Sequence, residues 1–367
     1  MYINQVKRTP SKYGKEATRL EARKVQRVGY STLTVSLPRS WVQEVNLKQG
    51  DVVSIKREDD GSLRVFSGLE QKHEEAKKCI IDADLCDKPD LLTRLITGNY
   101  ILGHDTIQVV SKRELKPEHL EETRRATQRL TGLGVVEQTL RQVTVQSFVD
   151  PTKFPVYGLV RRLHIVISSM QEAAVKALVE RRPELASEVS HMESEADRIY
   201  WLVVRQLLLA IRDRSVGAKI GIESPTHVAG NRIVVKTLEE MADSAENIAK
   251  EVTAMKDLSS ASESILDGIS KFSAMVQSVS DKMMKALLTL DVKLANDAIA
   301  NSEAAMKEQR KLTEKILTSV KEVSLAVSLR TIVWNLAEIA KYAKIIGEIA
   351  INRTLEAPSE ICRLEKA

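Results

Sequence analysis

Four carboxylates of this chain have the spacing of metal ligands on helices. Glu193 and Asp197 lie four residues apart, and so do Glu239 and Asp243. Because residues i and i+4 share one face of a helix, each pair can direct two oxygen atoms at the same point. Two neighbouring helices would then form a site for a divalent or trivalent metal, and oxygen ligands suit iron, Mn, Mg or Ca better than zinc or copper. The alternative for either pair is an ordinary solvated acidic face.

The stretch that carries these carboxylates is repeated further along the chain. Lys176-Ala177-Leu178 matches Lys285-Ala286-Leu287 at a shift of 109 residues, and Ala242–Ala245 matches Ala340–Ala343 at a shift of 98. The second copy replaces the four carboxylates with Ser302, Met306, Ala337 and Lys341. Glu303 lies one position out of register, so a local slip could restore one carboxylate. One half of a duplicated scaffold therefore retains a site that the other half has lost.

The elements that position these residues are long helices. From Pro155 onward the sequence has helical periodicity almost without a break. We expect helices near 155–181, 183–213, 231–256, 260–289, 291–320 and 325–354. Breaks fall at Arg182-Pro183, in the Gly- and Pro-bearing stretch 215–230, and in the Ser-rich stretch 259–264. The pattern predicts a mainly α protein with two tandem three-helix bundles, at 151–257 and 259–356.

Short strands precede the helical part. Leu33, Val35 and Leu37 alternate with polar residues, and 52–56 and 63–66 read as strands on either side of the turn Asp59-Asp60-Gly61. The segment 21–67 is too short to bury a core alone, so we expect it to dimerise. Residues 70–150 mix helical and strand patterns and predict a small α/β domain of unassigned role, with helices near 91–102 and 117–130 and strands near 106–110, 135–136 and 143–145.

Basic charge is concentrated at the start of the chain. The net charge is +5, and residues 1–30 alone contain eight Lys/Arg and two Asp/Glu. Residues 1–20 lack periodicity and read as a flexible basic arm. This distribution fits contact with a polyanion, although a solvated basic tail is the alternative.

Cysteine usage and hydropathy point to the cytoplasm. The three cysteines show no CxxC spacing, and an odd number argues against a disulfide framework. The first twenty residues lack the apolar core of a secretory signal. The most apolar run, 199–211, is interrupted by Arg205 and Gln206, so we expect no membrane insertion.

The residues around both carboxylate pairs resemble the PhoU family. The runs 193–197 (ESEAD) and 238–249 (LEEMADSAENIA) look like the two E/DxxxD helices of that family, and the resemblance covers about 150–356. It implies two similar three-helix bundles that carry metal clusters on their surface. Carried over position by position, the metal ligands would be Glu193, Asp197, Glu239 and Asp243. The second bundle departs from the family pattern at all four positions, which argues against a second cluster.

The segment before the helices resembles another family. The segment 23–65 is similar to the AbrB/SpoVT swapped-hairpin DNA-binding domain, which implies an intertwined dimer that reads DNA mainly through basic side chains. The residues in the corresponding basic positions are Arg23, Lys24, Arg27 and Arg39. Such domains also serve purely for dimerisation, so that role is the alternative to DNA binding. The combination of both domains resembles archaeal phosphate-uptake regulators of the PhoU type.

Three classes of function follow from these features. The leading hypothesis is a cytoplasmic homodimer that regulates phosphate homeostasis, senses phosphate status or a transporter component through its bundles, and acts on DNA. The second is an adaptor that represses a phosphate transporter by direct protein contact. The third is a metal-dependent hydrolase or oxidase, which would need acid/base groups beside an open metal position. The sequence places no such groups there, so we assign no catalytic residue and expect no enzyme.

Overall fold

The chain forms two compact units, which divide between residues 75 and 76. The computed structural model describes residues 21–57, 61–68, 78–255, 260–356, 358 and 361–363. The expected basic arm 1–20 and the turn residues Asp59 and Asp60 lie outside the described residues.

The described residues of the first unit form two antiparallel strand pairs and one short helix. Its elements are β1 (Gln26–Val28), β2 (Thr32–Thr34), α1 (Arg39–Glu44), β3 (Val53–Arg57) and β4 (Leu63–Ser67), with β1 paired to β2 and β3 to β4. Gly29, with φ of 69°, makes the tight turn between β1 and β2. The strand expected to run through Leu37 ends at Thr34, because its pairing with β1 ends at Gln26.

The apolar side chains of this unit are exposed. None of the residues described between 21 and 68 is buried. Leu33 and Leu63 each leave 66% of their surface exposed, and Ile55 leaves 61%. Removing such side chains from water is the main favourable term in folding, so one copy of this segment gains little of it. The expected lack of an independent core is therefore confirmed for the described residues.

The second unit begins with a four-stranded sheet and two helices. Its elements are β5 (Lys78–Asp82), α2 (Leu91–Ile101), β6 (Thr106–Val110), α3 (Pro117–Arg129), β7 (Leu133–Gln138) and β8 (Gln142–Ser147), with a short 3₁₀ turn at Ala83–Leu85 between β5 and α2. The strand order is β5-β6-β8-β7, with only β5 and β6 parallel. Ile96 and Tyr100 of α2 pack with Ile107 and Val145 of the sheet. This α/β domain matches the sequence prediction, except that β5 was not predicted.

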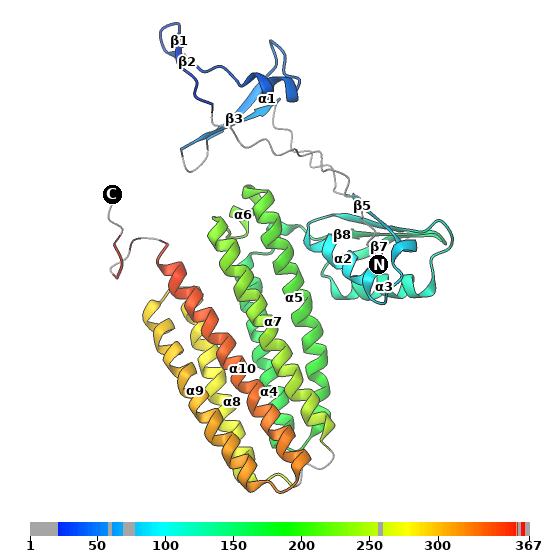
Figure 1. Ribbon diagram of the computed structural model, residues 1–367, viewed down its shortest axis with the longest axis vertical. Coiled ribbons are helices and arrows are strands. Elements are labelled where there is room, and N and C mark those ends of the chain that lie inside the picture. The colour runs from blue at the N-terminus through cyan, green and yellow to red at the C-terminus, as the bar shows by residue number, and fades with distance from the viewer. Residues whose placement is uncertain are drawn as a thin grey trace, which may run out of the picture. The chain divides into compact units, whose positions relative to one another are not determined.

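Long antiparallel helices form the rest of the unit (Figure 1). They are α4 (Val156–Val179), α5 (Ser187–Arg212), α6 (Arg214–Lys219), α7 (Pro225–Ala254), α8 (Glu263–Thr289), α9 (Val292–Ser319) and α10 (Val323–Thr354), with 3₁₀ turns at Pro151–Lys153 and Pro183–Ala186. Helices α4, α5 and α7 make one bundle and α8, α9 and α10 the other, and the two bundles meet along α7–α10 and α4–α8.

One boundary differs from the prediction. The stretch 215–230 was expected to interrupt the helices, but it contains α6 and the first turns of α7. Ser224 caps α7 by accepting a hydrogen bond from the His227 amide (3.2 Å), and Pro225 occupies the first helical position. Ser followed by Pro is a start signal for a helix, so the proline begins α7 rather than breaking it.

Helix α10 contains a long apolar stretch. By length and composition it could cross a membrane, because an 18-residue window of it has a mean hydropathy of 1.3. It packs against α7, α8 and α9, and its Leu329, Leu336 and Ile346 are almost fully buried. Much of its apolar surface is therefore buried in the core of the two bundles, whereas Val323, Val327 and Trp334 are exposed.

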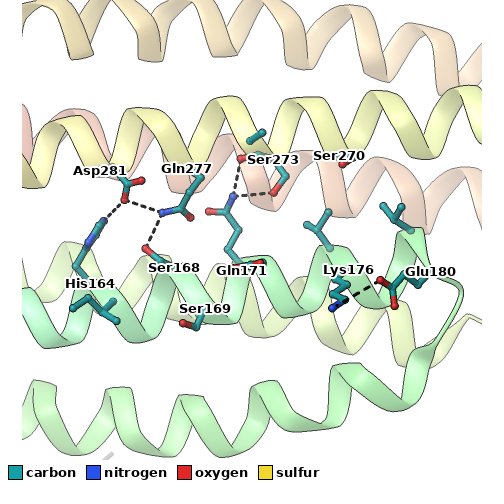
Figure 2. Close-up of a pocket in the computed structure, with 15 residues that line it drawn as sticks. His164, Ser168, Ser169, Gln171, Lys176, Glu180, Ser270, Ser273, Gln277 and Asp281 are labelled. Atoms are coloured by element: carbon teal, nitrogen blue, oxygen red, sulfur yellow. Dashed lines mark hydrogen bonds and ion pairs between the residues drawn. The ribbon is translucent and has the colours of Figure 1, made fainter.

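Polar side chains line the contact between α4 and α8, beside a cavity of about 650 Å³ (Figure 2). Gln277 of α8 donates to Ser168 Oγ of α4 (2.8 Å), and these two residues are equivalent at the repeat shift of 109. A contact between equivalent positions lies on a two-fold axis, as in a symmetric dimer. The two bundles therefore pack like the halves of a dimer joined in one chain.

Two crossed contacts flank this axis. His164 Nε2 shares a hydrogen bond with Ser280 Oγ (3.0 Å), and Gln171 donates to Ser273 Oγ (3.0 Å). Ser273 is the repeat equivalent of His164, and Ser280 is the repeat equivalent of Gln171. The two contacts are therefore equivalent by the repeat: exchanging the roles of α4 and α8 converts one into the other. The duplication read from the sequence is therefore present in the packing as well.

Candidate metal centre

The four carboxylates expected to bind metal lie on two helices that pack together. Glu193 and Asp197 are on α5, and Glu239 and Asp243 are on α7. The opposite faces of both helices enter the core through residues such as Leu202 and Leu238. This amphipathic pattern turns the carboxylates toward the outside of the bundle.

The carboxylates of α5 and α7 lie close enough to act on one another. Burial, followed by the charges of Asp197 and Glu246, raises the pKa of Glu193 to about 7, and Asp243 adds to this shift. Burial, followed by Glu239 and Glu240, raises the pKa of Asp243 to about 6, and Asp197 also contributes. Like charges that are crowded and partly desolvated favour the protonated form. The structure therefore brings negative charge from both helices to one place.

Two cations already contact this cluster. Arg129, at the end of α3, forms an ion pair with Asp197. Lys236, one turn before Glu239 on α7, forms ion pairs with Glu239 and with Glu240 (2.7 Å to Glu240). Two of the four predicted ligands thus have a basic partner within the protein. Glu193 and Asp243, the other two, carry the raised pKa values.

Sequence reasoning missed several residues of this site. Ligand oxygens of Glu239, Glu240 and Asp243 lie within 4.8 Å of one another, so Glu240 belongs to the cluster as much as the predicted residues do. Glu246 acts on Glu193 from the next turn of α7. The run LEEMADSAENIA contains signals for Glu240 and Glu246. Glu240 is adjacent to Glu239, and Glu246 shares a helical face with Glu239 and Asp243.

The donors of this cluster fit a hard cation. All of them are carboxylate oxygens, which are the ligands that Mg, Ca and Mn prefer. Glu193 and Asp243 are half-buried and crowded, and a cation would relieve that crowding. The fit therefore depends on the chemistry of the donors together with their mutual repulsion.

The second bundle is different at every equivalent position. Ser302 is 1% exposed and donates to the Ala340 carbonyl oxygen (2.8 Å). Met306 packs against the core, Ala337 is buried, and Lys341 pairs with Glu338 (3.0 Å). Glu303, which a slip might have brought into place, pairs instead with Lys344 (3.4 Å). Among the described residues of this bundle, the four equivalent positions therefore hold no carboxylate cluster.

The four predicted DNA-binding residues lie in the first unit. Arg23 and Lys24 precede β1, Arg27 is the middle residue of β1, and Arg39 begins α1. All four are exposed, and Arg23 pairs with Glu21.

Comparison with known proteins identifies two parts of the chain. The PhoU domain model matches residues 160–252 and again 269–350. The helical region is a pair of PhoU domains. The first PhoU domain corresponds to the bundle with the carboxylate cluster, and the second to the bundle without it. Residues 26–68 match the model described as antidote-toxin recognition MazE, bacterial antitoxin, so the first unit is a MazE/AbrB-like domain.

Solved structures of PhoU proteins are similar to about half of this chain. The crystal structure of PhoU from Pseudomonas aeruginosa matches with 15% identity and a TM-score of 0.47, over 53% of this chain and 93% of that one. The phosphate transport system regulatory protein PhoU from Streptococcus pneumoniae matches with 16% identity and a TM-score of 0.46, over 53% and 91%. No curated protein matches the chain.

Proposed function

We propose that this protein is a cytoplasmic, homodimeric, DNA-binding regulator of phosphate homeostasis, with an ion site in its first PhoU domain. The observation that carries the proposal is the union of two PhoU domains with a MazE/AbrB-like domain in one chain. PhoU domains link it to phosphate, since the Streptococcus pneumoniae PhoU is described as a regulatory protein of a phosphate transport system. The MazE/AbrB-like domain supplies the link to DNA.

Dimerisation through the first unit is supported by its exposed apolar residues. Leu33, Ile55 and Leu63 each leave more than half of their surface in water. A second copy that interleaved its strands would cover these side chains, and the buried area would stabilise both copies. Dimerisation would also double the basic surface that faces DNA.

DNA contact would come from the basic residues of this unit. Arg23, Lys24, Arg27 and Arg39 are exposed, and two copies would present eight such charges. Lys and Arg neutralise phosphates and release counterions, so binding would weaken steeply with salt. Base-specific contacts would come on top of this general attraction.

The ion would be held by Glu193, Asp197, Glu239 and Asp243, with Glu240 and Glu246 beside them. Iron, Mn, Mg and Ca all suit such donors. A bound ion would supply positive charge and open coordination positions for phosphate oxygens. We propose a sensory rather than a catalytic role, because the basic groups that touch the cluster, Arg129 and Lys236, are engaged in ion pairs.

Duplex-DNA binding across a salt series tests the proposal. The wild-type protein is compared with the triple variant Arg23→Gln/Lys24→Gln/Arg27→Gln, each with and without Mn²⁺ and inorganic phosphate. Lys293→Gln/Lys307→Gln/Lys321→Gln is the matched control, because it removes three exposed charges from the second PhoU domain.

We expect wild type and control to bind, and the triple variant to lose affinity and most of its salt dependence. Absence of DNA binding by wild type under every condition would overturn the DNA role. The MazE/AbrB-like domain would then serve dimerisation alone, and an adaptor that represses a phosphate transporter by contact would become the better hypothesis.

A further inference from the structure

The α/β domain contacts α5 of the first PhoU domain at two places: its α2 end meets α5 at Arg205, and its α3 end meets α5 at Asp197. At one end Arg205, 2% exposed, donates to Asp105 Oδ1 (2.9 Å) and to the carbonyl oxygen of Tyr100, whose ring lies under its guanidinium. Arg212, further along α5, donates to the Leu102 carbonyl oxygen. Removing one partner of a buried charge leaves the other uncompensated, so this end is held firmly.

The other end is held by exposed contacts. Arg129 pairs with Asp197, and Thr131 Oγ donates to the Arg198 carbonyl oxygen (3.2 Å). The Arg129 side chain is 56% exposed, whereas that of Asp197 is 13% exposed. An ion pair that water reaches on one side contributes less to stability than a fully buried one, and its exposed partner can be exchanged for another cation. The attachment at the α3 end is therefore much the weaker of the two.

Arg129 stands where a cation would bind. Its partner Asp197 is one of the four carboxylates of the proposed ion site, and Glu193 also attracts its charge. A guanidinium and a metal ion at one carboxylate cluster repel each other, so each weakens the binding of the other. Arg129 belongs to the α/β domain, which lies outside the PhoU domain and to which the sequence assigned no role.

Building on the ion site proposed above, we infer that Arg129 is a further residue of that site and competes with the bound ion for Asp197. Ion binding then releases the α3 end of the α/β domain, while Arg205 keeps the other end on α5. The α/β domain is thereby the part of the molecule that responds to ion occupancy. The class of ligand that drives the release is a hard divalent or trivalent cation.

The first test is Mn²⁺ binding, measured by calorimetry on the chelator-treated full-length protein. Arg129→Gln is compared with Arg125→Gln, a matched control on the same helix. Arg125 pairs with Asp90 of its own domain (3.0 Å) and is similarly exposed. We expect Arg129→Gln to tighten Mn²⁺ binding by roughly tenfold, because a competing charge is removed. Arg125→Gln should stay within about twofold of wild type, since the repulsion of a more distant exposed charge is screened.

The second test is amide hydrogen exchange in wild type with and without Mn²⁺, which needs no variant. We expect Mn²⁺ to accelerate exchange several-fold at residues 126–131 and to leave residues 98–103, at the Arg205 end, unchanged. Exchange reports local opening of this kind. If Mn²⁺ binds but exchange at 126–131 does not change, or if Arg129→Gln leaves the Mn²⁺ affinity unaltered, the role of Arg129 is wrong and the ion site still stands. If neither the wild type nor Arg129→Gln binds Mn²⁺, the proposed ion site is wrong as well.

Discussion

The two PhoU domains share one scaffold and differ in what they place on it. Both consist of three long helices, and their contacts across α4 and α8 obey the repeat shift of 109. The first domain gathers carboxylates from α5 and α7, whereas the second has Ser302 bonded to a backbone carbonyl and Lys341 paired with Glu338. The two domains therefore keep one fold although the equivalent positions differ in chemistry and in burial, so a site can be gained or lost without loss of the scaffold.

The residues of the second domain at the positions equivalent to the four carboxylates favour stability more than the carboxylates do. A buried hydroxyl with a hydrogen bond and an ordinary surface ion pair cost little. The first domain keeps half-buried carboxylates that repel one another, as the raised pKa values of Glu193 and Asp243 indicate. Groups that lower stability are typical of sites retained for a function. The predictions below test this contrast.

The largest expected effect is loss of the ion from the first domain. Glu193→Ala with Asp243→Ala removes the two carboxylates that form no ion pair with any described residue, and we expect the affinity for Mn²⁺ to fall by roughly a thousandfold. The matched control is Ser302→Ala with Lys341→Ala, at the equivalent region of the second domain, which should leave binding unchanged. Calorimetry and metal analysis give the affinity, and circular dichroism checks the helices. Unchanged metal content in the first variant would refute the site.

The next effect is on stability, from placing a carboxylate in the second domain. Ser302→Glu puts a charge where the side chain is 1% exposed, and we expect a loss of about 3 kcal/mol in the free energy of unfolding. Glu193→Ser, the reverse change in the first domain, should stabilise the metal-free protein. Urea unfolding in the presence of a chelator measures both. If both substitutions changed the free energy of unfolding by the same small amount, the contrast between the two domains would be contradicted.

Most of the helical architecture could be predicted from the sequence, because it depends on periodicity. The helix near 291–320 is α9 (Val292–Ser319), and the helix near 260–289 is α8 (Glu263–Thr289). The start of α7 was missed by about six residues, since Pro225 was read as a break. Shifting the start of α10, Val323, back by 98 residues gives Pro225, so the repeat contained the correct boundary.

The candidate site could be predicted only in part. The two carboxylate pairs lie on adjacent helices as expected, because i and i+4 spacing fixes their common face. Arg129 could not be predicted, since it reaches Asp197 from a separate domain 68 residues away in the chain. Strand β5 was missed because its buried side chain, Ile81, stands among exposed or partly exposed neighbours. Local patterns carry no information about which separate domains come into contact.

A smaller effect is the pH dependence of the metal-free protein. The folded pKa of Glu193 is raised to about 7 and that of Asp243 to about 6, above their ordinary values. The folded state then holds more protons than the unfolded state between about pH 4 and pH 7, so stability falls as pH rises through that window.

We expect this loss to be about 2 kcal/mol after allowance for screening at half-exposed groups. Glu193→Gln with Asp243→Asn should abolish it, whereas Glu303→Gln with Glu338→Gln, in the second domain, should not. Thermal unfolding in a chelator from pH 4.5 to pH 7.5 makes the measurement. Parallel pH profiles for the wild type and the first variant would show that these carboxylates do not cause the effect.

The smallest expected effect concerns the contact between the two PhoU domains, where α4 packs against α8. Burial lowers the pKa of His164, and the attraction of Asp281 opposes this shift. A lowered folded pKa means that stability is present above the unfolded pKa of about 6.5 and is lost as pH falls through the folded value. Protonation of His164 would charge a group that is 6% exposed and would disturb its hydrogen bond with Ser280.

We therefore expect the α4–α8 contact to weaken by about 1 kcal/mol on acidification below pH 6.5, a change opposite in direction to that of the carboxylates. His164→Gln should remove this pH dependence, because glutamine keeps a donor and an acceptor but does not titrate. Gln171→Met is the control, since Gln171 forms the symmetry-related contact with Ser273 and has no charge to lose. Its variant should be less stable at every pH, with the wild-type slope. An unchanged slope in His164→Gln would assign the acid sensitivity to another part of the molecule.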